Sequence, residues 1–273
     1  MAVFLIACGS RSELGVYQRK GQAPDAAPDG NLPPGCDVAD STILLLEESG
    51  DLHRFNPLSL EVAELGKLSC RDEFNSMTVS RSGTLYLNST NGELYTADPG
   101  TLGCQKTRFD ASQVQYERFG MGFVADDVPS GESLYIAPQT AAIVVKLATI
   151  ELPALQVRDV ARLPQSVPAA EVKGTGDGRL YLFHVATGGQ DAQLIEIDKR
   201  TAAFGAAVNL ALGQPFRGFD FAFWGGAFYV FSSLWGESTA RVIRYWPDLG
   251  TLEELGRIPV IVVGAAVSTC APL

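Results

Sequence analysis

The chain has 273 residues, of which 46% are hydrophobic and 19% charged, and its formal net charge at pH 7 is −10. This length suits one large all-β domain or two ordinary domains, and the apolar fraction is enough for a substantial core. The acidic balance, with no cluster of Lys and Arg, argues against a protein that binds the phosphate backbone of nucleic acids.

The chain begins with MAVFLIAC, an apolar stretch that ends in a cysteine. These residues resemble the bacterial lipobox, in which the cysteine is lipidated and becomes the mature N-terminus, so Cys8 is the predicted lipidation site. The segment lacks the length and the basic start of a complete export signal. Either the start of the chain is truncated or misassigned, which other signs of export favour, or the match is accidental. We interpret residues 1–8 as a residual signal segment.

Residues 9–35 are rich in Gly, Ala, Pro and Asp and carry no strand pattern. This composition is typical of a disordered tether, here one that holds a domain of residues 36–273 away from a membrane. No later stretch is long and apolar enough to span a bilayer, so we expect membrane contact only through the lipid anchor. The predicted location is the bacterial cell envelope, as a lipid-anchored, periplasmic or extracellular protein. The choice between inner and outer membrane stays open.

From residue 42 onward the sequence repeats at intervals typical of propeller blades. One landmark is a short apolar strand, usually with a tyrosine after a glycine-bearing turn: TILL (42–45), TLYL (84–87), SLYI (133–136), RLYL (179–182) and AFYV (227–230). Another is a break after the following strand: HRFNPLSL (53–60), YTADPGTL (95–102), KLATIEL (146–152), EIDKRTA (196–202) and YWPDLGTL (245–252).

A further strand precedes four of these copies and has two apolar residues five positions apart. The pairs are Phe74/Val79, Phe119/Val124, Val167/Val172, Phe216/Phe221 and, at the C-terminus, Val262/Val267. Four short strands repeated radially predict an all-β fold, a five-bladed β-propeller. Because the fifth pair lies at the end of the chain, we predict that the C-terminal strand completes blade one. Residues 260–267 would then pair with residues 43–46 and close the ring.

The cysteines fit this closure. Cys36 precedes the first strand and Cys270 follows the last, so a closed ring would bring both to one turn. A disulfide would fasten the ring there, and export would supply the oxidising conditions; the alternative is two unpaired small hydrophobic residues. Cys70 and Cys104 are a second possible pair. The repeat aligns Cys104 with Val62, so this pairing stays open.

The glycine turn, the apolar-tyrosine strand and the Asp-Pro-x-Thr break are similar to the repeat of bacterial extracytoplasmic β-propellers of the NHL, YVTN and quinoprotein-like group. The resemblance covers roughly residue 36 to the C-terminus and implies an architecture, because families that share the repeat differ in function. The sequence lacks the tryptophan docking motifs of quinone-cofactor propellers and the inner-strand carboxylate set of calcium-dependent lactonases. Neither activity is therefore carried over.

Propellers generally bind ligands where the loops between blades meet near the central channel. Here those loops would bring together charged and aromatic residues, which suit a polar ligand or a peptide. The alternative for each charged residue is an ordinary solvated loop charge in a surface pair that contributes little. Trp235, near a loop tip, would stack on a sugar or anchor a partner, or else cover its own blade. The predicted ligand-binding residues are Arg71, Asp72, Glu73, Tyr116, Arg118, His184, Arg217 and Trp235, with Glu117 beside them.

Glu171 and Asp220 hold the same position in the inner strands of successive blades. Two carboxylates from adjacent blades could act as acid and base in glycoside hydrolysis, or could coordinate a calcium ion. The alternative is a pair of buried carboxylates that accept hydrogen bonds from neighbouring loops. Neither histidine has a cysteine or carboxylate at a metal-ligand spacing, so we expect no further metal site and no other cofactor.

The combined interpretation is an exported, lipid-anchored propeller that binds a protein or a glycan at the cell envelope without catalysis. The alternative is a carbohydrate-active hydrolase that uses Glu171 and Asp220, and a purely structural assembly protein is a third possibility. We expect no nucleic-acid partner. The sequence does not fix the oligomeric state.

Overall fold

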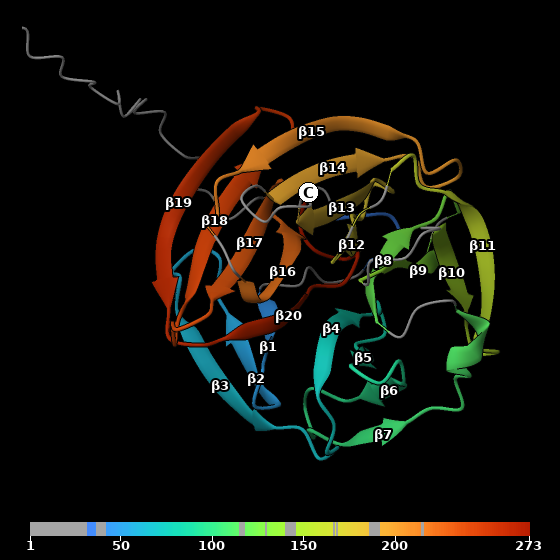
Figure 1. Ribbon diagram of the computed structural model, residues 1–273, viewed down its shortest axis with the longest axis horizontal. Coiled ribbons are helices and arrows are strands. Elements are labelled where there is room, and N and C mark those ends of the chain that lie inside the picture. The colour runs from blue at the N-terminus through green and yellow to red at the C-terminus, as the bar shows by residue number, and fades with distance from the viewer. Residues whose placement is uncertain are drawn as a thin grey trace, which may run out of the picture.

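The computed structural model describes residues 32–36, 42–114, 118–128, 130–139, 146–165, 167, 169–185, 192–213 and 216–273. Within this part of the chain, five four-stranded antiparallel sheets stand in a ring around a central channel (Figure 1). The fold is the all-β, five-bladed β-propeller that the sequence predicts. A single-turn 3-10 helix, η1 (Ala111–Gln113), precedes the third blade.

Each blade is a meander whose first strand lies innermost, where it contacts the first strands of the neighbouring blades. From the inside outward, blade 1 consists of β20 (Val262–Ala266), β1 (Ile43–Glu47), β2 (Asp51–Phe55) and β3 (Val62–Lys67). Blade 2 consists of β4 (Phe74–Val79), β5 (Leu85–Ser89), β6 (Leu94–Ala97) and β7 (Cys104–Lys106). Blade 3 consists of β8 (Phe119–Ala125), β9 (Glu132–Pro138), β10 (Lys146–Glu151) and β11 (Gln156–Arg162). Blade 4 consists of β12 (Glu171–Gly174), β13 (Leu180–Val185), β14 (Ala192–Ile197) and β15 (Phe204–Leu210). Blade 5 consists of β16 (Phe216–Trp224), β17 (Ala227–Leu234), β18 (Ala240–Trp246) and β19 (Thr251–Ile258).

The two ends of the chain share blade 1, as predicted. Strand β20 pairs antiparallel with β1, with Leu44 opposite Ala266, Leu45 opposite Ala265 and Leu46 opposite Gly264. Figure 1 shows the red C-terminal strand beside the blue N-terminal one. This pairing leaves no open edge between the first and last blades of the ring.

The break motifs are tight turns stabilised by an Asn or Asp side chain. In three blades its Oδ1 accepts the backbone N–H two residues further on, as in Asx turns: Asn56 from Leu58 (2.9 Å), Asp98 from Gly100 (2.7 Å) and Asp198 from Arg200 (2.9 Å). Two positions later the backbone φ is positive, at Leu60, Leu102 and Ala202. The repeated motif is therefore a local turn that starts the outer strand of the blade.

Large side chains from adjacent blades pack against each other between the sheets. The cluster between blades 5 and 1, for example, includes Phe55, Tyr229 and Phe231, with Phe55 and Phe231 in edge-to-face contact at 5.2 Å between ring centroids. Nearer the axis the inner strands pack closely. A Cβ on Gly120 or Gly122 of β8 would lie within 2.5 Å of the backbone of β12, so glycine is required at both positions.

Two details of the predicted strands differ. The inner strand of blade 4 begins at Glu171, and Val167 is buried just outside it. His184 was expected in a loop, which is wrong. It lies in β13, is buried, and its Nε2 lies 3.2 Å from Oε1 of Gln193 on the paired strand β14. The apolar-tyrosine strand RLYL therefore continues further than its motif.

Residues 32–36 and the C-terminal residues cover one end of the channel, where the inner strands turn back into their hairpins. Pro33 lies against the β12–β13 turn so closely that a Cβ on Gly176 would come within 2.4 Å of its ring. The Arg81 side chain, at the β4–β5 turn, donates to Pro34 O (3.0 Å) and to Thr269 Oγ1 (2.6 Å). On the C-terminal side, Pro272 O accepts from the backbone of the β16–β17 turn (2.8 Å). We call this the closed end.

A disulfide between Cys36 and Cys270 joins these two segments, with a Cα–Cα distance of 5.5 Å. A second disulfide, between Cys70 and Cys104, joins the loop after blade 1 to the outer strand of blade 2, with a Cα–Cα distance of 5.2 Å. The first is the predicted pairing, and the second is the pairing that the sequence analysis left open. Disulfides are typical of proteins in oxidising compartments. No helix within the described residues has the length and hydropathy that a bilayer crossing requires.

Candidate functional site

The opposite end of the channel opens into a cavity of about 610 Å³. Its walls come from the first residues of the inner strands and from the turns that follow the second strands, and every blade contributes. The lining residues are Glu48, Glu73, Phe74, Asn75, Thr90, Arg118, Gln139, Ala169, Arg217, Gly218, Phe219, Trp235 and Val263. A cavity of this volume is within the range of small-ligand sites. We call it the mouth.

Four of the predicted ligand-binding residues line the mouth: Glu73, Arg118, Arg217 and Trp235. They come from blades 2, 3 and 5, so the loops between blades converge as expected. Sequence reasoning missed Glu48, because a glutamate in a short hairpin turn gives no signal that distinguishes it from ordinary turn charges.

The other predicted residues have different positions. Arg71 and Asp72 share the loop of Glu73 but do not line the mouth; Asp72 instead accepts a hydrogen bond from the Tyr95 hydroxyl (2.8 Å). His184 is buried within blade 4, and its burial lowers the pKa of its imidazole. The prediction that His184 binds a ligand is therefore corrected, since its side chain is only 3% exposed and cannot contact a ligand in the mouth. Tyr116, Glu117 and the proposed lipidation site Cys8 lie outside the described residues.

The charges around the mouth are balanced. Arg217 forms an ion pair with Glu48, and its Nε lies 3.3 Å from Glu48 Oε1. The Arg118 Nε donates to the carbonyl of Thr90 (3.4 Å). With Glu73, the lining holds two guanidinium groups and two carboxylates. Among the lining residues that the structure describes, the formal charges therefore sum to zero, although the whole protein is strongly acidic.

Trp235 is the exposed aromatic residue of the mouth. It follows β17 in a turn, and 63% of its surface is exposed. The guanidinium carbon of Arg217 lies 5.8 Å from the centroid of its ring, a cation–π contact. Arg217 thus joins Glu48 and Trp235, which belong to blades 1 and 5.

The floor of the mouth is made of two amides that connect to a buried polar network. The Asn75 and Gln139 side-chain amides lie 2.8 Å apart, and Gln139 Nε2 donates to Oε1 of Glu171. Glu171 has no exposed surface. The mouth therefore ends at these amides, and the charged groups lie beneath them.

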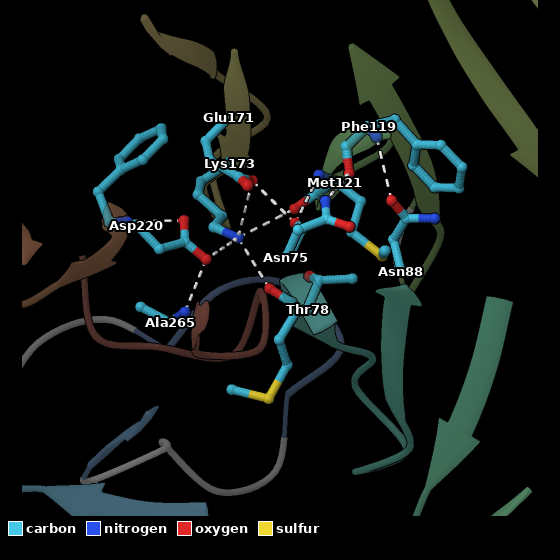
Figure 2. A network of polar contacts seen from close by, with 12 residues as sticks. Asn75, Thr78, Asn88, Phe119, Met121, Glu171, Lys173, Asp220 and Ala265 are labelled. Atoms are coloured by element: carbon cyan, nitrogen blue, oxygen red, sulfur yellow. Dashed lines mark hydrogen bonds and ion pairs between the residues drawn. The ribbon is translucent and has the colours of Figure 1, made fainter. Parts of the chain in front are cut away.

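The buried network is centred on Lys173 of β12 (Figure 2). Its Nζ donates to the carbonyls of Met77 (2.8 Å) and Met121 (3.0 Å), and forms an ion pair with Asp220 Oδ2 (3.0 Å). The same Nζ lies 3.7 Å from Glu171 Oε2. One ammonium thus links the inner strands of blades 2, 3, 4 and 5.

Two further contacts extend the network around the ring. Asp220 Oδ2 accepts the backbone N–H of Ala265 in β20 (2.6 Å), which brings in blade 1. Ser76 Oγ donates to Glu171 Oε2 (2.8 Å) and accepts the N–H of Met121 (3.1 Å). All five inner strands are therefore joined through buried polar groups, and such groups are stable only when they are satisfied in this way.

Burial alters the titration of both carboxyl groups. It raises the pKa of Asp220 to about 6, against the opposing effects of Lys173 and the Ala265 N–H. Burial and the nearby Asp220 charge raise the pKa of Glu171 well above its ordinary value, although Lys173 and Ser76 act in the other direction. The Lys173 ammonium can balance only one of the two carboxylates. The two carboxyl groups therefore keep a proton to a higher pH than exposed carboxyl groups do.

This geometry does not suit either chemistry considered for Glu171 and Asp220. Both side chains have no exposed surface, so neither presents an oxygen to a substrate. The position between them, where a calcium ion would need oxygen ligands, holds the Lys173 ammonium. Within the described residues, no group of three or more His, Cys, Asp or Glu side chains is arranged to hold a metal ion. Both carboxyl groups are buried acceptors, but the donors Ser76, Lys173 and Ala265 lie on inner strands and not on the neighbouring loops that the alternative interpretation named.

No known protein family matches the sequence, and no curated protein is similar to it. Solved structures with similar folds include hydrazine synthase of Kuenenia stuttgartiensis, at 13% identity over 86% of this chain and 70% of that chain, with a TM-score of 0.47. A second is TolB from Acinetobacter baumannii, at 14% identity over 79% of this chain and 52% of that chain, with a TM-score of 0.47. This chain therefore spans about half of that protein. A third is a chain of a nidogen/laminin complex, at 14% identity over 86% of this chain and 83% of that chain, with a TM-score of 0.47. Similarity at this level carries no argument about activity or ligand.

Proposed function

We propose that this protein is a non-catalytic binding module that captures a ligand at the open end of its propeller channel. The observation that carries the proposal is the mouth itself, a cavity of about 610 Å³ to which all five blades contribute. Its exposed Trp235 offers a large apolar surface of the kind that recognition sites use. The channel's candidate acid and base are fully buried around Lys173, which favours binding over hydrolysis.

We further propose that the protein is exported and held at the bacterial cell envelope by a lipid on Cys8. The two disulfides support an oxidising location. The described N-terminal segment, from Leu32, lies at the closed end of the channel. A tether formed by the preceding residues would therefore attach to the end opposite the mouth, and the mouth would face away from the membrane.

The binding proposal is tested by capture from a cell-envelope fraction. Immobilised parent protein is compared with a Trp235→Ala, Arg118→Ala double variant, and with Trp246→Phe as a control on β18 that does not line the mouth. We expect the parent and Trp246→Phe to retain the same material, identified by mass spectrometry, and the double variant to lose it. Equal capture by all three proteins contradicts a binding site at the mouth.

The absence of catalysis and the lipid anchor have separate tests. On a panel of glycans the parent should show no hydrolysis, and turnover that disappears in Glu171→Gln and Asp220→Asn would establish the hydrolase instead. For the anchor, cells that express the protein from its genomic start are labelled with a palmitate analogue. Label should appear on the parent and be lost in Cys8→Ser, whereas an unlabelled parent contradicts the anchor.

A further inference from the structure

The mouth has a chemistry that narrows the class of ligand, and this inference rests on the function proposed above. The formal charges of its described lining cancel: Glu48 and Arg217 neutralise each other, and Glu73 and Arg118 provide one charge of each sign. An ionic ligand would gain little from such a site, since steering and binding of ions depend on an excess of the opposite charge. The lining favours an uncharged, polar ligand.

The most exposed apolar surface of the described lining is the flat indole of Trp235, and Phe219 is partly exposed in the same lining. Trp235 exposes 63% of its area, while Phe74, a neighbour in the lining, exposes only 7%. Arg217 approaches the indole at 5.8 Å from the ring centroid and is itself held by Glu48, so the tryptophan is supported by an ordered side chain. A rigid aromatic surface at the edge of a polar cavity suits a flat, partly apolar group that stacks on it.

The polar part of the site is rich in groups that bind hydroxyls. The floor consists of the Asn75 and Gln139 amides, and the walls add guanidinium groups and carboxylates. Amides donate and accept, guanidinium groups donate, and ionised carboxylates accept, so together they match ligand hydroxyls, which do both. A protein partner would need a deep apolar pocket for an anchor residue, whereas the described lining places the polar Asn75 and Gln139 amides at its floor.

We infer that the mouth binds a neutral oligosaccharide, with one sugar ring stacked on Trp235 and its hydroxyls bonded to the amides and charged groups of the floor and walls. Pyranose rings combine an apolar C–H face with a rim of uncharged hydroxyls, which corresponds to the flat indole and the balanced polar lining. The volume of about 610 Å³ accommodates a short segment of a chain rather than a long one.

The test uses neutral tetrasaccharides of β-1,4-linked glucose and of β-1,4-linked N-acetylglucosamine, with tetragalacturonate as the acidic comparison. Binding is measured by titration calorimetry and by tryptophan emission, since Trp235 is the exposed one of three tryptophans. We expect at least one neutral probe to bind and to change the emission, and tetragalacturonate to bind at least about tenfold more weakly.

The variants connect binding to the stacking surface. Trp235→Ala should weaken calorimetric binding about tenfold or more, and Trp235→Phe should restore part of it. Trp246→Phe is the matched control, because Trp246 also lies beside an arginine, Arg244, at 4.2 Å but outside the mouth. It should bind like the parent, and circular dichroism should show the same fold for all variants.

Three outcomes overturn the inference: neither neutral probe binds at millimolar concentration, the acidic probe binds more tightly, or Trp235→Ala binds as the parent does. The envelope capture experiment separates this failure from failure of the proposed function. If a protein is captured through the mouth while neither neutral sugar binds, the binding function holds and the glycan assignment falls. If neither experiment depends on mouth residues, both fall.

Discussion

The two ends of the channel are built from the same inner strands, yet they differ in how their polar groups are used. At the closed end Arg81, Glu132 and Thr269 bind one another, Arg81 also binds the segment of residues 32–36, and burial raises the pKa of Glu132. At the open end Trp235 and Glu73 are exposed, and the Arg118 Nε donates to the backbone carbonyl of Thr90. Saturated polar groups indicate a structural role, and accessible ones indicate recognition.

The largest effect should come from the closed end, where Cys36→Ser with Cys270→Ser removes the disulfide between the chain ends. The bond spans 234 residues. The chain-entropy relation gives a loss of about 5 kcal/mol for a loop of that length, against about 4 kcal/mol for the 34-residue Cys70–Cys104 loop. Guanidinium unfolding of both double variants measures the two losses. A terminal variant that unfolds at the same midpoint as the parent contradicts the role of this bond in closing the ring.

Lys173→Met tests the middle of the channel. The change leaves two buried carboxyl groups and two strand carbonyls without their shared donor, and breaking a buried pair in this way costs about 3–5 kcal/mol. Lys106→Met is the control, because the Lys106–Glu93 pair is largely exposed and such pairs contribute about 0–1 kcal/mol. Urea unfolding at pH 7 compares them. Equal stabilities for the two variants would show that the network does not hold the inner strands.

The pH dependence of stability should distinguish Glu171→Gln from the parent. A carboxyl whose pKa is raised by folding binds more protons in the folded state, so stability falls as pH rises from its unfolded pKa to its folded pKa. For Asp220 this window runs from its ordinary value near 3.8 to about 6, and for Glu171 from near 4.5 upward. Glu171→Gln lacks the second contribution.

We therefore expect the variant to gain stability relative to the parent as pH rises from 5 to 8, by less than the Lys173 effect. Thermal unfolding of both proteins in matched buffers at several pH values provides the measurement. A constant difference across that range would show that Glu171 does not titrate differently in the folded state.

The smallest effect on stability should come from the open end. Glu48→Gln removes the ion pair with Arg217, which is partly exposed, so the free energy of unfolding should change by about 1 kcal/mol or less. Its effect should instead appear in binding, because Arg217 loses the contact that holds it beside Trp235. A large fall in melting temperature would place this pair with the structural groups and weaken the contrast between the two ends.

The fold could be predicted because its determinants are local or repeated. The break motifs are turns that Asn56, Asp98 and Asp198 stabilise within a few residues, and their recurrence marks each blade. Ring closure followed from the extra strand pattern at Val262. The convergence of Glu73, Arg118 and Arg217 could be predicted because all three lie at the start of an inner strand or directly before it.

The centre of the channel could not be predicted in the same way. Lys173 resembles any polar residue of a half-buried strand, and its partners Met77 and Asp220 lie in other blades, at distances that only the closed ring makes short. Sequence reasoning placed Glu171 and Asp220 together but did not find the cation between them. His184 was misplaced because its apolar strand continues beyond the tyrosine motif and buries it.

Titration calorimetry of the neutral tetrasaccharides with Asp220→Asn and Trp235→Ala tests most directly the claim that recognition belongs to the mouth and structure to the network beneath it. We predict that Asp220→Asn binds within about twofold of the parent despite its altered stability, while Trp235→Ala, with parental stability, binds about tenfold more weakly. Loss of binding in Asp220→Asn together with parental binding in Trp235→Ala would contradict the account.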